Sequence, residues 1–326
     1  MSNVKVICLG EILVDKLADQ LGKSPAQVQT WTDYPGGAPA NVACALTKLG
    51  TKSAFIGSVG NDSIGQNLIQ LLSDIGVITH GIQIHPTAPT RQVYVTRSYS
   101  GDRNFAGFGN QPADQFADAF LDEIKLPTQL FLSAEFLVLG TLELAYNQTQ
   151  KAVFQAIKLA QKNNLKIILD INWRPMFWQN IDQAIPLIKE VIKSVHFLKL
   201  AKEEAQLLFN TENAAQIYHK LGDIEGVLIT AGGEGNVNYC MNEFFGEIPP
   251  FNVKSVDTTG AGDAFVAGFI HQLVTKGMKI LDDKQQIEQM IIYACAVGAL
   301  TTLSPGAIAS QPTPVQVDQF LQKTFR

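Results

Sequence analysis

Short apolar runs alternate with longer amphipathic segments along most of the chain. A short apolar run is typical of a buried strand, and apolar positions three or four residues apart indicate a helix. We expect strands at 4–9, 53–56, 136–139, 166–170, 196–200 and 226–230, and helices at 41–49, 64–72, 148–161, 182–194 and 202–209. Strands separated by helices predict right-handed crossovers and a parallel sheet that is covered on both faces.

Two stretches, residues 12–35 and 86–110, depart from this rhythm. Polar and apolar residues alternate in both, and neither contains a good helix; the second turns through Ser100-Gly101-Asp102. We expect both to leave the sheet edge and pair into a small antiparallel flap. A flap beside an α/β crevice is where a lid belongs, because such sheets bind ligands beyond the carboxyl ends of their strands. A β-hairpin without a functional role is the alternative.

Composition narrows the possible function classes. The 326 residues are 46% hydrophobic and 17% charged, with a net charge of −5, which excludes a disordered chain. This charge gives no general attraction to nucleic acid or to an anionic membrane, so we expect neither as a partner. A phosphorylated ligand would need a local positive potential.

The four cysteines and the apolar runs indicate the compartment. The cysteines form no CxxC pair, so they are interpreted as buried thiols in a reducing environment. No apolar run reaches the length of a membrane span, and the N-terminal run is too short for a signal peptide. We therefore expect a cytoplasmic protein.

The segment Asp257-Thr-Thr-Gly-Ala-Gly-Asp263 carries the strongest chemical signal. It is followed by a helical apolar pattern, so residues 260–262 should lie at a helix N-terminus. Free backbone N–H groups and the helix dipole make such a turn an anion site without a basic side chain. Asp263 would then lie beside the anion, where it could take a proton from a hydroxyl that attacks phosphorus. An acid that merely favours the helix N-terminus is the alternative.

A second glycine cluster, Gly36-Gly37-Ala-Pro-Ala-Asn41, precedes the helix expected at 41–49. Adjacent glycines let a ligand approach the backbone, and an asparagine can both donate to and accept from a sugar hydroxyl. A simple turn would also explain them. The chain has no GxxxxGK[ST] motif, which excludes a Walker-type nucleotide site, and no GxGxxG opens a helix after the first strand.

Together, the motifs GGAPAN at 36–41 and DTTGAGDAF at 257–265 resemble the ribokinase-like (PfkB) sugar kinases, and the resemblance covers residues 4–312. It implies an α/β fold: a ribokinase-like αβα sandwich with a mostly parallel central sheet, plus a small β-sheet lid. The core would comprise 1–11, 36–85 and 111–326, and the lid 12–35 and 86–110. It also implies phosphorylation of a sugar hydroxyl by ATP with Mg²⁺.

The same resemblance implies roles for individual residues. Asp263 would be the catalytic base, aided by an anion hole and one cation. The anion hole would be formed by Gly260, Ala261 and Gly262, and the cation would be Arg174. The sugar would be bound by Asp15, Gly37, Asn41, Arg103 and Glu143.

Nucleotide and metal ligands are implied in the same way. The nucleotide would be held by Asn172, Thr230, Gly232, Gly235 and Cys295. Glu204 would order Mg²⁺ through water, and Asp257, Thr259 and Ser310 would enclose K⁺. The chain departs from the family pattern at Ala201 and Cys295, where asparagine is common, which leaves nucleotide selectivity open.

The resemblance is strongest to fructokinases, through the lid stretch 97–105 and the block DINWRPMFW at 170–178. It implies that D-fructose is phosphorylated to fructose 6-phosphate. Two other sugar kinases, 2-keto-3-deoxygluconate kinase and ribokinase, are alternatives, as is a non-catalytic binding protein. A homodimer through the lid is a further expectation, with Trp31 and Tyr34 either in that contact or packed under the flap.

Overall fold

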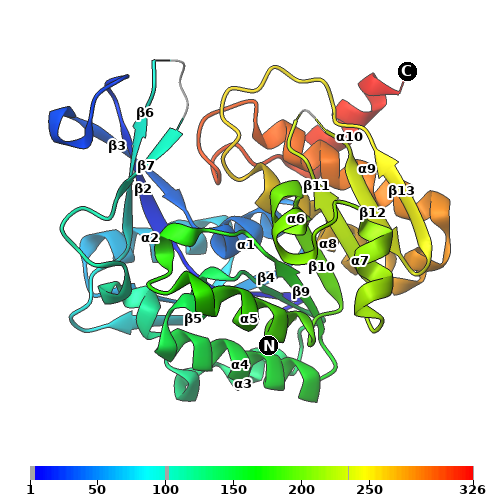
Figure 1. The fold of residues 1–326 in the computed structure, drawn as a ribbon, viewed down its shortest axis with the longest axis horizontal. Coiled ribbons are helices and arrows are strands. Elements are labelled where there is room, and N and C mark those ends of the chain that lie inside the picture. The colour runs from blue at the N-terminus through cyan, green and yellow to red at the C-terminus, as the bar shows by residue number, and fades with distance from the viewer. Residues whose placement is uncertain (1–3, 100–102, 234, 326) are drawn as a thin grey trace.

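A single sheet of nine strands forms the centre of the molecule (Figure 1). The computed structural model describes residues 4–99, 103–233 and 235–325. The strand order is β13-β12-β11-β10-β9-β8-β1-β4-β5, parallel from β5 to β11, with β12 and β13 as an antiparallel edge. The strands are β1 (Val6–Leu9), β4 (Ser53–Gly60), β5 (Ile78–His85), β8 (Phe136–Leu139), β9 (Lys166–Asp170), β10 (Phe197–Ala201), β11 (Gly226–Thr230), β12 (Val237–Met241) and β13 (Phe244–Ile248).

Helices cover both faces of this sheet (Figure 1). Side chains alternate across a strand, so Val6 and Cys8 pack into one core and Ile7 and Leu9 into the other. The first core includes α1 (Ala38–Lys48), α2 (Ser63–Ile75), α8 (Ala261–Lys276), α9 (Lys284–Thr301) and α10 (Pro314–Thr324); the second includes α3 (Thr128–Phe131), α4 (Asn147–Lys162), α5 (Ile181–Ile192), α6 (Lys202–Phe209) and α7 (Ala214–Leu221). The three-layer α/β fold predicted from the alternation of elements is confirmed.

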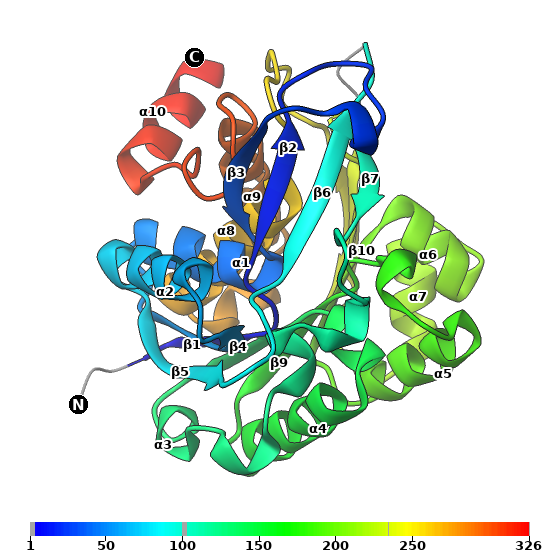
Figure 2. The ribbon, with the colours of Figure 1, turned by 90° about the vertical axis from the view of Figure 1, so that its left-hand side faces the viewer.

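Four further strands stand above the core as a separate sheet, the lid (Figure 2). They are β2 (Leu13–Ala18), β3 (Trp31–Gly36), β6 (Gln92–Arg97) and β7 (Arg103–Gly107), in the order β3-β2-β6-β7. The expectation of an antiparallel flap is only partly right, because the central pair β2–β6 is parallel. Both strands leave the carboxyl ends of parallel core strands, β1 and β5, and therefore run in the same direction. The turn expected at 100–102 lies outside the described residues.

The apolar runs locate the buried strands better than the edge strands. The strands predicted at 136–139, 166–170 and 226–230 have these same bounds in the structure. Strands β5 and β13 are the two edges of the sheet, and most of their residues are only partly buried, so they lack a continuous apolar run. Short 3₁₀ helices lie at Pro25–Gln27, Ala113–Gln115, Ala117–Phe120, Glu123–Lys125, Leu142–Ala145, Pro175–Phe177 and Met278–Asp282.

A buried ion pair anchors the base of the lid. Arg91, directly before β6, is 1% exposed and donates from Nε and Nη2 to the two carboxylate oxygens of Asp118, at 2.5 and 2.7 Å. Four rings surround its guanidinium, with centroids 4.7–5.4 Å from Cζ: Phe116, Phe177, Tyr146 and Phe108. The aromatic faces and the carboxylate offset the cost of burying this charge.

Removing one partner of this pair should destabilise the fold strongly. We expect Arg91→Met to lower the free energy of unfolding in urea by about 3–5 kcal/mol, because Asp118 is left as an unpaired buried charge. Lys193→Met, which breaks the exposed pair with Glu190, is the control and should cost less than about 0.5 kcal/mol. Equal losses in the two variants would contradict the anchoring role.

Candidate active site

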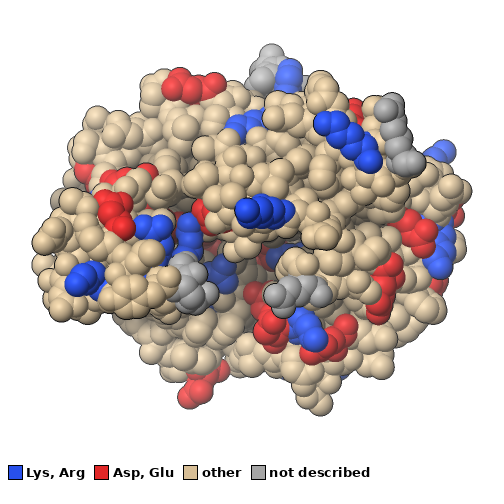
Figure 3. Space-filling view, turned by 90° about the horizontal axis from the view of Figure 1, so that it is seen from above, with Lys and Arg blue, Asp and Glu red and all other residues tan. Residues whose placement is uncertain are grey.

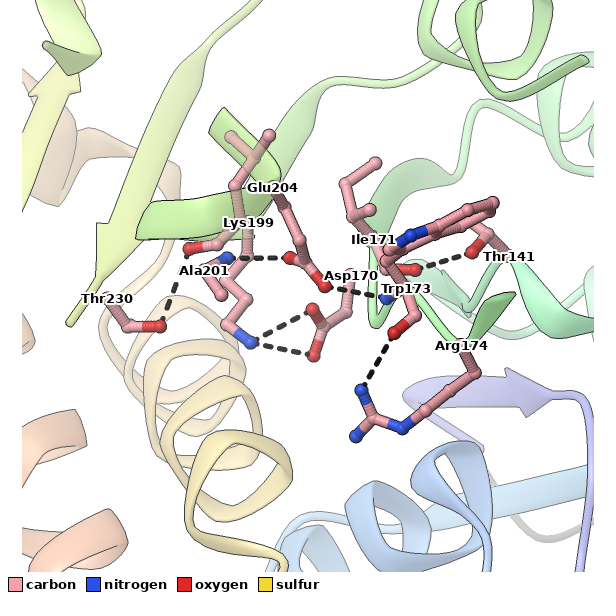
Figure 4. Close-up of polar contacts among 10 residues, drawn as sticks. Thr141, Asp170, Ile171, Trp173, Arg174, Lys199, Ala201, Glu204 and Thr230 are labelled. Atoms are coloured by element: carbon pink, nitrogen blue, oxygen red, sulfur yellow. Dashed lines mark hydrogen bonds and ion pairs between the residues drawn. The ribbon is translucent and has the colours of Figure 1, made fainter. Parts of the chain in front are cut away.

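The carboxyl ends of the parallel strands meet beneath the lid, and polar side chains gather there (Figure 4). Residues 171–174 follow β9, and Thr230 ends β11. Thr230 donates to the Leu200 carbonyl at 3.4 Å, and Thr141 donates to the Ile171 carbonyl at 2.5 Å. Seen from above, basic side chains line the hollow between the lid and the rest of the molecule (Figure 3).

The glycine turn before α8 has the geometry of an anion site. Gly260 is the N-cap residue, with a left-handed φ of +78°, and α8 begins at Ala261. A Cβ on Gly260 would lie 2.6 Å from the Cβ of Ala307, so no side chain fits there. The first N–H groups of the helix have no acceptor within it and can bind an anion. The predicted helix N-terminus at residues 260–262 is confirmed, and its role as an anion hole remains a proposal.

Asp263 lies in the first turn of α8 and is held by Asn41 of α1, whose Nδ2 donates to its Oδ2 at 2.7 Å. The pKa of the Asp263 carboxyl is raised to about 7, first by burial and then by the charge of Asp170. The Asn41 bond and the positive charges of Lys199 and Arg174 limit this rise. A carboxyl that titrates near neutrality can accept a proton from a substrate and release it again.

A buried lysine, which the sequence analysis did not single out, lies beside the glycine turn. Lys199 of β10 is 7% exposed, and its Nζ donates to both carboxylate oxygens of Asp170, at 3.0 and 3.2 Å (Figure 4). This Nζ lies 3.2 Å from the position that a Cβ on Gly262 would take. The structure thus places an ammonium group against the glycine turn. The lysine that interrupts the apolar run Phe-Leu-Lys-Leu was the available signal.

Glu204, expected to order Mg²⁺ through water, joins the ends of two strands. Its Oε1 accepts from the Trp173 N–H and its Oε2 from the Ala201 N–H, both at 2.6 Å. In the described part of the chain, no three His, Cys, Asp or Glu side chains converge on one metal position. A carboxylate held in this way fits an ion that it reaches through water, and Mg²⁺ bound with nucleotide phosphates usually keeps several waters.

Asp15 faces the cleft from the lid strand β2. Burial raises the pKa of its carboxyl to about 6, and the positive charges of Arg103 and Arg174 act in the opposite direction. Gly37, the N-cap of α1, has a φ of +108°, and a Cβ there would lie 2.4 Å from the Glu11 carbonyl oxygen. A Cβ on the neighbouring Gly36 would lie 3.0 Å from Asp15 Oδ2, so Asp15 also lies against this glycine turn.

Glu143, also predicted to contact sugar, forms a buried acidic pair with Glu11, which the sequence analysis missed. The two residues are 2% and 4% exposed. Glu11 accepts from the Ala38 N–H at 2.7 Å, whereas neither oxygen of Glu143 has a donor among the described residues. Burial raises the pKa of both carboxyls, and their mutual repulsion raises that of Glu11 further. The pair is therefore stable only when it retains a proton.

The predicted nucleotide residues lie on three separate elements. Thr230, Gly232 and Gly235 belong to β11 and the turn after it, and the neighbouring residue 234 is outside the described residues. Asn172 has a left-handed φ of +43°, directly beyond β9. Cys295 lies on α9, and burial raises the pKa of its thiol to about 12, so it stays neutral.

The residues expected to enclose K⁺ converge, but Asp257 already has four donors. Its Oδ1 accepts from the N–H and hydroxyl of Thr259, at 3.0 and 2.7 Å. Its Oδ2 accepts from the Gly306 N–H at 3.0 Å and from Arg103 Nη2 at 2.7 Å. Ser310 donates from its hydroxyl to the Gly306 carbonyl at 2.5 Å. Arg103, expected at the sugar, is thus paired with Asp257.

Comparison with known proteins assigns the family. The model of the pfkB family of carbohydrate kinases matches residues 3–314. The chain belongs to this family. This carbohydrate kinase is 34% identical over 319 residues to the probable fructokinase-5 of Arabidopsis thaliana, covering 97% of each chain.

Solved structures with the same fold contain nucleotide and sugar. The fructokinase from Xylella fastidiosa with bound ATP superposes with a TM-score of 0.89 at 27% identity, over 99% of each chain. A double mutant of the fructokinase from Vibrio cholerae, bound to fructose, ADP and a potassium ion, gives 0.83 at 28% identity and covers 98% of this chain and 99% of that one. Within the described residues of the carbohydrate kinase, no helix is long and apolar enough to span a membrane.

The Asp263 carboxyl should control the pH dependence of the reaction. With a pKa of about 7 it is protonated, and inactive as a base, at lower pH. We expect kcat/KM to fall about tenfold between its plateau and pH 6, because roughly a tenth of the carboxyl is ionised one unit below its pKa. The measurement is kcat/KM for the phosphoryl acceptor between pH 5.5 and 9.

Replacing Asn41 tests the origin of this pKa. Asn41→Ala removes the hydrogen bond that favours the ionised form, so the acidic limb of the profile should move to higher pH. The far-ultraviolet circular dichroism of the variant should match that of the wild type. An unmoved limb in a folded variant would show that Asp263 is not the titrating base.

Proposed function

We propose that this carbohydrate kinase is a fructokinase that transfers the γ-phosphoryl group of ATP to the 6-hydroxyl of D-fructose, giving fructose 6-phosphate and ADP. The observation that carries the proposal is Asp263, positioned by Asn41 beside the N-terminus of α8 and beneath a lid. The similarity to fructokinases over nearly the whole chain supports fructose as the acceptor.

In the proposed reaction, Asp263 accepts the proton of the sugar hydroxyl as its oxygen attacks the γ-phosphorus. The bond from the γ-phosphorus to the β,γ-bridging oxygen breaks, and ADP leaves. Backbone N–H groups at residues 260–262 would hold the phosphoryl oxygens, with Arg174 as a nearby positive charge. Such transfers depend mainly on positioning and electrostatic stabilisation. Bound with ATP, Mg²⁺ would offset phosphate charge, with Glu204 reaching its water shell.

The polar groups at the sugar side favour a neutral polyol. Asp15, whose pKa is about 6, is mostly ionised at neutral pH and can accept hydrogen bonds from hydroxyls. Arg103, the lid cation near it, is paired with Asp257. The ionised Asp15 would repel the carboxylate of 2-keto-3-deoxygluconate, so this arrangement favours fructose over that sugar acid. Ribose stays as an alternative acceptor.

The remaining predictions concern location and assembly. All four cysteines are unpaired, which supports a reducing compartment such as the cytoplasm. Trp31 packs edge-on against Tyr94, at 5.0 Å between centroids, and Tyr34 lies against Gly306. Both aromatic residues thus have contacts within the chain, and a homodimer through the lid remains a prediction.

Removal of the proposed base should separate catalysis from binding. We expect Asp263→Asn to lower kcat by about 10²–10⁴-fold, the usual range for a general base, while the sugar dissociation constant stays within about threefold. Asp33→Asn in the lid, which breaks only the pair with Lys16, is the matched control and should keep its turnover. Near wild-type turnover of Asp263→Asn would contradict the proposed role of Asp263 as the base.

A panel of acceptors tests the substrate. ADP release should be measured with D-fructose, D-ribose, 2-keto-3-deoxygluconate and adenosine at equal concentrations. We expect fructose to give the highest kcat/KM. A higher value for another sugar would reassign the acceptor, and no turnover on any of them would favour a non-catalytic binding protein.

A further inference from the structure

Both edge strands of the lid contact the loops that form and support the glycine turn at residues 260–262. Arg103 of β7 pairs with Asp257, whose side chain is 8% exposed. On the opposite edge strand, β3, the ring of Tyr34 lies 3.2 Å from the position that a Cβ on Gly306 would take. Asp257 also accepts from Gly306, so the two contacts converge on one junction of the core.

This junction supports the anion site directly. Asp257 holds Thr259 through two hydrogen bonds, and Thr259 precedes Gly260. Gly306 precedes Ala307, which packs against Gly260. The shape of the turn at residues 260–262 therefore depends on the Asp257 carboxylate being held in place.

The residues around Asp257 do not fit a monovalent cation while the lid is in this position. Both carboxylate oxygens accept two hydrogen bonds each, and the Gly306 carbonyl accepts from the N–H and hydroxyl of Ser310. Among the described residues, Asp257 forms its ion pair with Arg103 alone. A guanidinium at 2.7 Å would repel a second positive charge at the same carboxylate.

We propose that Arg103 is a positioning residue. Its positive charge, carried by the lid, holds the Asp257 carboxylate and through it the anion turn, in place of a bound K⁺ ion. The inference rests on the proposed sugar kinase function. When the lid closes over the sugar, the pair forms and the turn is held; when the lid opens, Asp257 loses the counter-ion that Arg103 supplies. Lid closure and assembly of the anion site are then one event, which couples phosphoryl transfer to the presence of sugar.

Three variants test the proposal by activity. Arg103→Met removes the charge and Arg103→Lys keeps it. The control is Arg97→Met, a lid arginine that donates to the carbonyls of Ala18 and Asp19 within the lid. Fructose-dependent ADP release is measured in KCl and in tetramethylammonium chloride at equal ionic strength, and the sugar dissociation constant by calorimetry.

We expect the wild type, Arg97→Met and Arg103→Lys to change kcat by less than about twofold between the salts. Arg103→Met should lose about tenfold or more of kcat in tetramethylammonium, with an almost unchanged sugar dissociation constant, and should recover much of it in K⁺. A weaker sugar affinity with unchanged kcat would instead assign Arg103 to the sugar and overturn the proposal. So would a wild type that loses about tenfold of its activity without K⁺.

Thermal unfolding with saturating D-fructose and no ATP, which keeps the lid closed, gives a readout that does not require turnover. An ion that binds the folded state raises its melting temperature. We expect no K⁺-specific rise over choline chloride for the wild type and a clear rise for Arg103→Met, whose carboxylate is free to bind K⁺. A K⁺-specific rise in the wild type, or none in Arg103→Met, would overturn the proposal. If no sugar is phosphorylated, the proposed function fails while this readout still decides the role of Arg103 at Asp257.

Discussion

The hydrogen bond between Asn41 and Asp263 is the contact on which the organisation of the site depends. It joins the N-terminal turn of α1 to that of α8, although Asn41 and Asp263 lie 222 positions apart in the sequence. It satisfies one oxygen of a carboxyl that is otherwise held in an environment unfavourable to charge. The positions of α1 and α8 are therefore set by one another, and both helices pack on the same face of the sheet.

Around this contact, most buried charges are compensated in pairs. Lys199 neutralises Asp170 next to the glycine turn, and Arg91 neutralises Asp118 at the base of the lid. Glu11 and Glu143 have no cationic partner among the described residues and must keep a proton, and Glu204 is held by two backbone N–H groups instead. Burial of charge is costly unless the charge is paired, so these few groups lie where they shape the site.

Those parts of the candidate site that are formed by a short, local stretch of backbone could be predicted from the sequence. Glycines before a helix indicate a turn with free N–H groups, so the spacing predicted a helix N-terminus at residues 260–262 with Asp263 in its first turn, whereas the role of Asp263 came from the family resemblance. Lys199 was missed because a lysine within a buried strand is explained only by its partner, 29 residues away. Glu11 was missed for the same reason: its significance comes from Glu143, which lies in the 3₁₀ helix Leu142–Ala145, far away in the sequence.

The sequence by itself determined the alternation of strands and helices, the buried parallel core and the helix N-terminus with its acid, because these follow from periodicity and backbone conformation over a few residues. Only the tertiary structure decided the parallel centre of the lid, the edge strands of the sheet and the partner of Arg103. Each depends on which distant segments meet. The direction of β2 and β6 comes from the strands they leave, and the role of a long charged side chain such as Arg103 comes from the carboxylate with which it pairs.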